Sequence, residues 1–265
     1  MVEKRAPASV SKPGRAYVGV SGWTYAPWRG DFYPKGLTQK NELAYASSRL
    51  TSIEINGSFY ALQKPTSYAK WRDQTPDDFV FAVKGSRFIS HMKRLGDVEE
   101  ALATFFGSGV YELGPKLGPI LWQLPETFRY DAERVAAFFA QVPRRTPDGR
   151  PVRHALEFRS TTFNNADALA LLREHDVACV LADTAGRWPK VEADTSDFRY
   201  VRLHGDKELY ASGYGAAALD GWAEKVRTWV GAGQDVFVYF DNDIKGFAPH
   251  DAMGLIARLG NSQGT

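Results

Sequence analysis

The amino-acid sequence predicts an α/β protein folded as a single (β/α)8 TIM barrel. Eight short β-type runs alternate with helical patterns or loops along the chain, an order typical of parallel α/β folds rather than all-β folds. The length of 265 residues is also that of one such barrel. At least six of the runs carry a charged or amide residue at or near their C-terminal end. Because the C-terminal strand ends build the active site of these barrels, function is expected there.

The predicted strands follow one another with helices or loops between them. In chain order they are YVGVSGW (17–23), SIEINGSFY (52–60), FVFAVK (79–84), GPILWQL (118–124), RHALEFRS (153–160), VACVLAD (177–183), RYVRLHG (199–205) and DVFVYFDND (235–243). We find no composition break that indicates a second domain. The interpretation is therefore one barrel domain over residues 16–265, preceded by a disordered basic tail over residues 1–15.

Several helix starts have recognisable signals. Pro65 is favoured at a first helical position. Asp97 and Glu100 have the spacing of a capping box, and Asp131 can cap the helix in which apolar residues recur at helical spacing up to Val142. By contrast, residues 184–197 show no apolar helical period. They predict an irregular crossover in place of the sixth helix.

Composition limits the class of protein. Hydrophobic residues make up 44% and charged residues 24% of the chain, as in an ordinary soluble globular protein. No apolar run is long enough to span a membrane, and residues 1–15 lack the apolar core of a secretory signal. The single cysteine, Cys179, fits a cytoplasmic location. A formal net charge of +2 does not by itself indicate a polyanion partner.

Polar residues occupy the inward-facing positions near the strand ends. Alternation turns Ile53 and Ile55 toward the helices, which leaves Glu54 and Asn56 facing the barrel axis. The same reasoning assigns to the mouth Lys84, Gln123, Glu157 with Arg159, Asp183, Arg202 with His204, and Tyr239 with Asp241. The acids Glu54, Glu157, Asp183 and Asp241 nearly balance the bases Lys84, Arg159 and Arg202. Buried charges need partners, so these residues form either a structural ion-pair network or a ligand site; for the whole set we favour a ligand site.

Aromatic and basic residues are interspersed in the loops around the same end. Tyr25 belongs to an aromatic first loop, and Tyr60 follows the second predicted strand. Aromatic rings beside Arg and Lys suit a sugar, a nucleobase with phosphate, or single-stranded nucleic acid. The alternative is packing of the loops over the barrel top.

Several motifs are absent. The sequence has no Walker or dinucleotide-binding glycine pattern, no H-E-x-x-H and no Cys/His cluster. We therefore expect no cofactor and no metal. A retaining glycosidase needs two neighbouring carboxylates, but the fourth and seventh strands end in Gln123 and His204. A pair of Glu54 with Glu157 stays open.

Taken together, the strand-end strings resemble the YecE-like family, a domain of unknown function with a barrel fold. The strings are GVSGWTYAPWRGDFYP, SIEINGSFYALQKPTSYAKW, FVFAVKGSRFISH, LEFRS, YVRLHG and YFDNDIKGFAPHDA, and the resemblance runs from about Tyr17 to Leu259. The residues that the family pattern implies are Glu54, Asn56, Lys84, Glu157, Arg159, Arg202, His204 and Asn242. The chain departs from the pattern at Asp241 and in STTFNN after Arg159. At fold level the family has been likened to endonuclease IV and to sugar-isomerase barrels.

Three functions follow as hypotheses. The first is an enzyme acting on an anionic substrate, such as a phosphoester in a small molecule or nucleic acid. Lys84, Arg159 and Arg202 would hold the anion, and His204 or Glu54 would serve as general acid or base. The second is a metal-assisted sugar isomerase or epimerase with Glu54, Glu157, Asp183 and His204 as ligands, and the third is a binding protein without catalysis. The catalytic candidates are Glu54, Lys84, Glu157 and His204. The substrate-binding candidates are Tyr25, Asn56, Tyr60, Gln123, Arg159, Asp183, Arg202, Asp241 and Asn242.

Overall fold

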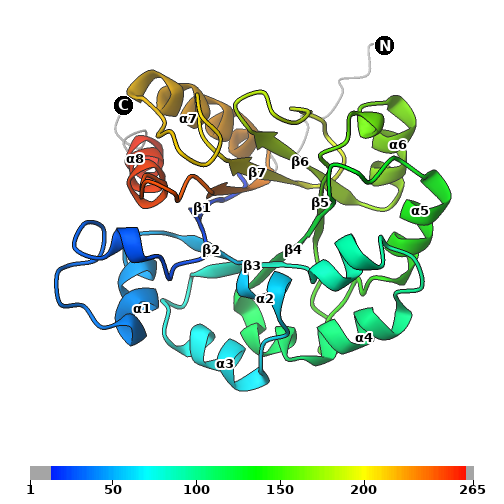
Figure 1. Ribbon diagram of the computed structural model, residues 1–265, viewed down its shortest axis with the longest axis horizontal. Helices are drawn as coiled ribbons and strands as arrows, with labels where there is room; N and C mark the ends of the chain where they lie inside the picture. The colour runs from blue at the N-terminus through cyan, green and yellow to red at the C-terminus, as the bar shows by residue number, and fades with distance from the viewer. Residues whose placement is uncertain (1–12, 261–265) are drawn as a thin grey trace, which may run out of the picture.

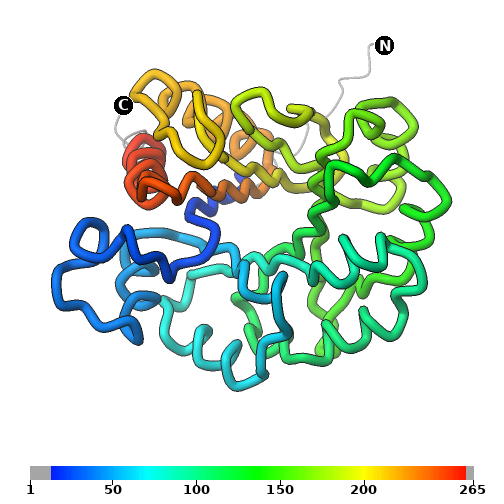
Figure 2. Tube along the Cα trace, viewed as in Figure 1, coloured from blue at the N-terminus to red at the C-terminus, as the bar shows by residue number. Residues whose placement is uncertain are grey.

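Eight parallel strands close into a barrel in chain order, β1 to β8, with β8 paired to β1. The computed structural model describes residues 13–260. Figure 1 shows the strands in the middle and the helices around them, and Figure 2 shows the chain passing once around the ring until α8 reaches the side of β1. The strands are β1 Ala16–Ser21, β2 Ser52–Ile55, β3 Val80–Lys84, β4 Leu117–Gln123, β5 His154–Glu157, β6 Val177–Asp183, β7 Phe198–Leu203 and β8 Asp235–Phe240.

Helices join most successive strands and cover the outside of the barrel. They are α1 Glu42–Ser47, α2 Gly57–Tyr60, α3 Pro65–Asp73, α4 Glu99–Gly107, α5 Ala132–Gln141, α6 Ala166–Glu174, α7 Ala216–Gly231 and α8 Ala248–Gly260. No helix forms between β6 and β7, where residues 184–197 are loop. The predicted single barrel with an irregular crossover at that place is thus confirmed.

Local signals were confirmed where the backbone is regular. Pro65 opens α3, and the Asp131 side chain accepts a hydrogen bond of 3.0 Å from the Arg134 backbone N–H at the start of α5. The capping box at Asp97 was wrong: Val98 is the N-cap of α4, and no side chain caps that helix. The preceding loop passes through left-handed conformations, with φ of 47° at Asp97, so the Asp97 side chain is not placed to cap.

The second predicted strand is shorter than expected. β2 ends at Ile55, and residues 57–60 form the single turn of α2. Ser58 fixes this turn, because its hydroxyl donates to the carbonyl oxygens of Ile55 (3.0 Å) and Lys84 (2.6 Å). The turn therefore links the ends of β2 and β3, and it directs Tyr60 to the surface.

Two apolar cores lie on the two sides of the strands. The outer core, between strands and helices, includes Ile53 and Ile55. The inner core combines aliphatic residues on β3 to β6, most of them alanine, with aromatic ones on β7 and β8: Ala82, Leu121, Ala155, Ala178, Val180, Ala182, Phe198, Tyr200, Phe237 and Tyr239. On most of these strands, the next residue on the inward face is charged or an amide. Apolar packing therefore fills the barrel up to the level at which the polar mouth begins.

Within residues 13–260, none of the helices has the length and apolar character needed to cross a membrane. The expected basic tail falls for the most part outside the described residues, which begin at residue 13.

Candidate active site

Arg202, on β7, lies at the centre of the mouth. Its side chain has no exposed surface. Its Nε and Nη2 donate to the two oxygens of Glu54 at 3.1 and 2.9 Å, Nη1 donates to Glu157 at 2.7 Å, and Nη2 also donates to Asp241 at 2.9 Å. Burial would lower the guanidinium pKa, but the three carboxylates raise it well above its ordinary value. A ligand at the mouth does not reach Arg202 directly, in contrast to the expectation that this side chain grips an anion.

Glu54, on β2, is buried beneath the mouth and fully hydrogen-bonded. In addition to Arg202, it accepts a hydrogen bond of 2.6 Å from the Tyr200 hydroxyl and one of 3.0 Å from Ser21. Ser21 and Tyr200 were missed in the sequence, although Tyr200 precedes Arg202 by two residues and therefore shares its face. With these partners Glu54 orients Arg202 and is not exposed to a ligand.

Glu157 and Asp241 complete the ring of carboxylates. Glu157 receives a second hydrogen bond, of 3.0 Å, from Arg159, and Asp241 lies 3.0 Å from Nδ1 of the buried His204. Burial would raise the pKa of both carboxyls, but Arg202 lowers both, helped by Arg159 at Glu157 and by His204 at Asp241. Both side chains are therefore ionised at neutral pH.

Lys84, at the end of β3, is buried without a partner. Only 8% of it is exposed, and no hydrogen bond or ion pair to its Nζ forms within residues 13–260. The Nζ lies 4.3 Å from the centre of the Phe59 ring. Burial, followed by the nearby charge of Arg202, lowers the Lys84 pKa to about 8. An ammonium group in this state is ready to receive an anion or to give up its proton.

Arg159 lies above the ring of carboxylates, in the loop after β5. Its guanidinium stacks on the Trp188 ring at 3.7 Å and donates to the Tyr210 hydroxyl at 3.2 Å. Glu157 takes Nε and Tyr210 takes one terminal nitrogen. The other terminal nitrogen forms no hydrogen bond within residues 13–260, so it can donate to a ligand. Trp188 was not predicted, since it lies in the irregular crossover after β6, where no sequence period identifies it.

His91 lies on the same side of the mouth, near Lys84 and Arg159. Its ring packs edge-on against Phe59 at 5.1 Å. Burial, followed by the charges of Lys84, Arg159 and Arg87, lowers its pKa to about 4, although Glu157 acts in the opposite direction. His91 is therefore neutral at pH 7 and lies near three cationic side chains.

Two predicted site residues lie outside this cluster. Asp183 forms an ion pair of 3.1 Å with Lys190 and accepts a bond of 3.4 Å from Tyr214. Asn242 donates to Asp251 at 2.8 Å and to the Ser212 carbonyl at 2.9 Å. Both positions follow an inward residue by one place, Ala182 and Asp241, so strand alternation turns them away from the axis.

The remaining candidates surround the cluster. Gln123 pairs in register with Glu157 and is buried. Tyr25 donates a hydrogen bond of 2.6 Å to the Ser21 carbonyl and, with Asn56 and Tyr60, lines a separate hollow of about 300 Å³. The mouth thus has a charged centre and an aromatic side.

Asp243, which follows β8, was not predicted. Burial raises its pKa well above the ordinary value, and the neighbouring Asp241 raises it further. Asp241, whose pKa is lowered, and Asp243, whose pKa is raised, thus differ in how readily each holds a proton, as do paired carboxyls that serve as base and acid.

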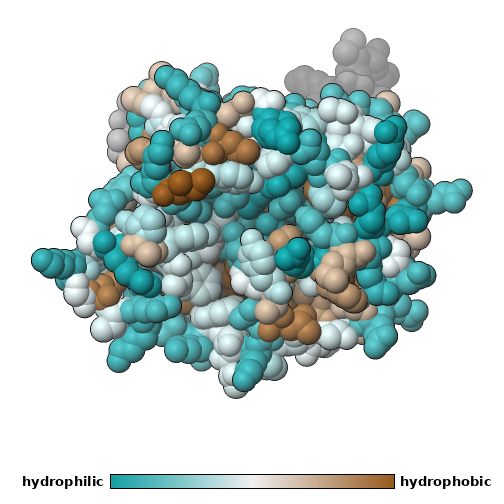
Figure 3. Space-filling model, viewed as in Figure 1, coloured by the Kyte–Doolittle hydropathy of each residue, from teal (hydrophilic) through white to brown (hydrophobic). Residues whose placement is uncertain are grey.

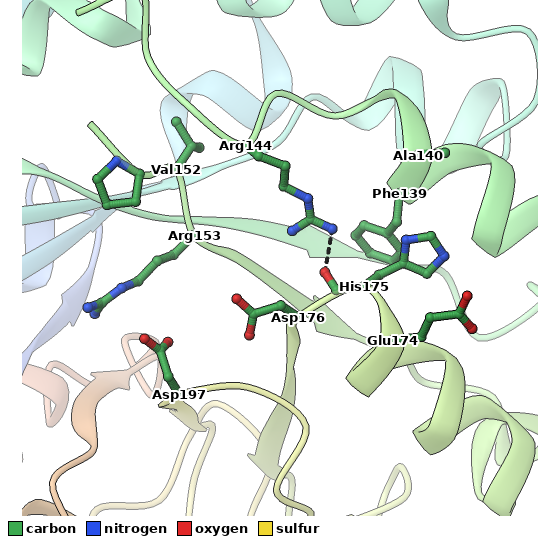
Figure 4. A pocket seen from close by; sticks show the side chains of 10 residues that line it. Phe139, Ala140, Arg144, Val152, Arg153, Glu174, His175, Asp176 and Asp197 are labelled. Atoms are coloured by element: carbon green, nitrogen blue, oxygen red, sulfur yellow. Dashed lines mark hydrogen bonds between the residues drawn. The ribbon is translucent and has the colours of Figure 1, made fainter. Parts of the chain in front are cut away.

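A larger cavity lies at the opposite end of the barrel. It has a volume of about 560 Å³ and is lined by residues that precede β5, β6 and β7, including Arg153, His175 and Asp197 (Figure 4). Arg144 points across it and donates to the His175 carbonyl. Because these residues lie at the N-terminal strand ends, where barrel residues serve stability, we place the active site at the other end.

The surface of the molecule is mostly polar in the face shown in Figure 3. Hydrophilic residues extend across its middle, and hydrophobic ones form small separate groups.

In residues 13–260 no three His, Cys, Asp or Glu side chains gather in an arrangement that could hold a metal ion. Glu54 and Glu157, expected as ligands in the isomerase hypothesis, are instead bound by Arg202.

Comparison with known proteins relates the whole barrel to one family. The family model described as "Protein of unknown function DUF72" matches residues 17–265. UPF0759 protein YunF of Bacillus subtilis (strain 168) is 26% identical over 277 residues, which cover 92% of this chain and 94% of that protein. UPF0759 protein YecE of Escherichia coli (strain K12) is 35% identical over 112 residues, 42% of this chain and only 38% of that protein's length.

Solved structures show the same fold. A DUF72 family protein from Thermotoga maritima superposes with a TM-score of 0.81 at 24% identity, covering 93% of this chain and 99% of that one. A DUF72 family protein from Enterococcus faecalis superposes with a TM-score of 0.75 at 18% identity, covering 92% and 95%. At these identities the superpositions establish the barrel architecture.

Proposed function

Because the chain belongs to the DUF72 family of proteins of unknown function, we propose its function from the geometry of its own mouth. The protein is an enzyme that binds the phosphate of a phosphorylated substrate between Lys84 and Arg159 and cleaves the phosphoester. The observation that carries this proposal is the unpaired ammonium of Lys84, nearly buried beside Arg202. The cytoplasmic location expected from the single cysteine stays a prediction.

Charge supports an anion at this place. Arg202 is neutralised by Glu54, Glu157 and Asp241, each within 3.1 Å of its nitrogens. Arg159 pairs with one carboxylate, Glu157, which also pairs with Arg202. Lys84 has no carboxylate partner within the described chain. A buried unpaired charge is unfavourable, so a phosphate between Lys84 and Arg159 supplies the missing partner and forms short charge-assisted hydrogen bonds.

The same groups can assist the chemistry. Water attacks phosphorus, the ester P–O bond breaks, and the leaving oxygen takes a proton from Lys84. With a pKa of about 8 in the free protein, and a higher one once phosphate is bound, the ammonium is protonated at pH 7 and can serve as the acid. The proton released by the attacking water then restores Lys84, so the net products are an alcohol and phosphate.

Calorimetric titration with inorganic phosphate tests the anion site. We expect Lys84→Met and Arg159→Met to weaken phosphate binding at least tenfold, the scale of about 1.5–3 kcal/mol for a hydrogen bond to a charged group. Lys35→Met is the matched control, because Lys35 is exposed in the first loop. Equal affinity in the wild type, both site variants and the control, or no phosphate binding to the wild type, contradicts the proposal.

A hydrolysis assay tests the reaction. Chromogenic phosphate monoesters and diesters are incubated with the wild type, Lys84→Met and Lys35→Met. Activity that Lys84→Met loses and Lys35→Met retains supports the proposed reaction. Phosphate binding that depends on Lys84 without hydrolysis of either ester class would favour a binding protein instead.

A further inference from the structure

An aromatic hollow lies beside the charged centre, between the loop after β1 and α2. We use "ring cleft" for this space of about 300 Å³, lined by Trp23, Tyr25, Asn56, Tyr60, Gln63 and Trp71 with the neighbouring backbone. Its lining holds aromatic rings and amides and no charged side chain. The ring cleft therefore suits an uncharged, planar part of a ligand.

The walls of the ring cleft are held in place before any ligand binds. Trp71 packs edge-on against Trp23 at 5.2 Å, and Tyr25 packs against Trp28 at 4.8 Å. The Tyr33 hydroxyl donates to the Trp23 carbonyl at 2.6 Å. Because ordering these rings has already taken place on folding, a flat ring can bind without a large entropic loss.

Tyr60 differs from these fixed walls. It is 71% exposed, an unusual position for a large aromatic side chain, and it lies on the short turn α2 at the edge of the ring cleft. An exposed ring at such an edge can lie against the face of a bound base, a contact that any nucleobase can make.

Asn56 supplies a directional contact. Its side-chain oxygen is buried and has no hydrogen-bond partner in the described chain, and the side chain lines the ring cleft. A buried acceptor without a partner is unfavourable. Rotation of the amide toward the ring cleft would bring this oxygen to an N–H group on the edge of a planar ring, such as a base amino or ring N–H, which would satisfy it.

The ring cleft and the proposed phosphate site share the turn α2. Phe59 contacts Lys84 Nζ, which lies 4.3 Å from its ring centre, and the Phe59 ring lies 5.0 Å from that of Tyr60. Two adjacent residues thus support the two sites. One ligand that carries a phosphate and a planar ring can therefore occupy both.

We propose that the ring cleft binds a nucleobase, so that the substrate is a nucleotide or a nucleotide unit of a nucleic acid. This proposal rests on the proposed function for the phosphate contact, but the ring contact is independent of it. Tyr60 and the fixed aromatic walls stack on the base, and Asn56 accepts a hydrogen bond from its edge.

Calorimetry with three probes separates the two proposals: inorganic phosphate, ribose 5-phosphate and a set of the four ribonucleoside 5′-monophosphates. We expect at least one monophosphate to bind tenfold or more tightly than ribose 5-phosphate. Tyr60→Ala should weaken that nucleotide several-fold to about a hundredfold, the range of base stacking. Asn56→Ala should weaken it about two- to tenfold, the scale of one lost hydrogen bond, and both variants should leave inorganic phosphate binding unchanged. Phe88→Ala is the matched control, because Phe88 is an exposed aromatic residue outside the ring cleft.

Each result decides between the sites. Phosphate binding that needs Lys84, with no preference for any nucleotide over ribose 5-phosphate, overturns the ring cleft and leaves the proposed function standing. Nucleotide binding that Tyr60→Ala weakens, with no binding of inorganic phosphate or ribose 5-phosphate, supports the ring cleft and overturns the phosphate site. Nucleotide binding that Tyr60→Ala, Asn56→Ala and Phe88→Ala leave unchanged also overturns the ring cleft.

Discussion

Arg202 and Glu54 form a two-point ion pair with no exposed surface on either side chain. The pair joins β7 to β2 across the barrel, and Glu157 and Asp241 extend it to β5 and to the end of β8. Removing one partner of a buried ion pair leaves an uncompensated charge, which is far less favourable than breaking a surface pair. The pair therefore stabilises the barrel fold at its mouth.

Arg202→Met should destabilise the fold strongly. Three carboxylates would lose their shared cation, and we expect the free energy of unfolding to fall by about 3–5 kcal/mol. Urea denaturation followed by circular dichroism measures it. Arg134→Met is the control, because the Arg134–Asp131 pair is exposed on both sides and should change stability by about 1 kcal/mol or less; equal losses in both variants would contradict the role of Arg202.

Lys84→Met should make the protein more stable at pH 7. The native fold lowers the Lys84 pKa from 10.5 to about 8, so keeping the ammonium charged in the fold opposes folding by about 3 kcal/mol. The unfolded chain binds this proton more tightly, so the unfavourable contribution is complete below pH 8 and disappears as the pH rises toward 10.5. Urea midpoints of the wild type and the variant should thus differ at pH 7 and converge near pH 10; a less stable variant at pH 7 would show that Lys84 has an unrecognised partner.

Strand alternation explains both what the sequence predicted and where it failed. Glu157 and Arg202 were predicted correctly to face the axis because each shares parity with an inner-core residue of its strand, Ala155 and Tyr200. Glu54 shares parity with Ser52, whose hydroxyl lies 2.7 Å from that of the inner-core Tyr239. Asp183 was assigned inward although Ala182, its neighbour, takes that position. Alternation shows which side chains face the axis but not which of them form ion pairs. The near balance of acids and bases at the mouth could therefore be predicted from the sequence, whereas the pairing of Arg202 with three carboxylates could not.

Strand and helix periods could not predict which residues between the strands contact the site. Trp188 and His91 come from segments without a helix or strand period, and only the folded loops place them against Arg159 and Phe59. The same holds for α2, where a predicted strand continues as a helical turn because Ser58 bonds back to Ile55 and across to Lys84. These side-chain bonds depend on two strands being adjacent, which the local sequence does not show.

Gly85→Ala should disturb the end of β3. A Cβ at Gly85 would lie 2.3 Å from the ring of Trp122, and that ring is fully buried, so the indole must move. Overpacking of this kind is expected to lower the free energy of unfolding by about 1–3 kcal/mol. Gly107→Ala is the control, because a Cβ there meets nothing within 4 Å. Tryptophan fluorescence and urea denaturation measure the difference; a Gly85→Ala protein as stable as the control would contradict the packing described here.

Glu157 should make stability sensitive to acid. Its pKa lies below the ordinary 4.5 in the fold because Arg202 and Arg159 outweigh the effect of burial. A lowered native pKa stabilises the fold above pH 4.5, and this stabilisation is lost as the pH falls below that value. Glu157→Gln should therefore be less stable than the wild type at pH 6 and lose less stability between pH 6 and pH 3. Glu192→Gln, which removes an exposed pair with Lys225, is the control and should follow the wild type; identical acid profiles for Glu157→Gln and the wild type would contradict the pairing.

Phosphate affinity should fall as the pH rises above about 8, for a reason specific to Lys84. In the free protein the Lys84 ammonium has a pKa of about 8, and a bound phosphate, as its new partner, raises that pKa. Binding then takes up a proton between the two pKa values, so affinity decreases with rising pH through this range. Calorimetry in buffers of different ionisation enthalpy measures the proton uptake directly. The Lys84→Met variant, which has no such proton, should show weak binding without this loss above pH 8, and a wild-type affinity that stays constant from pH 7 to pH 10 would remove Lys84 from the phosphate site.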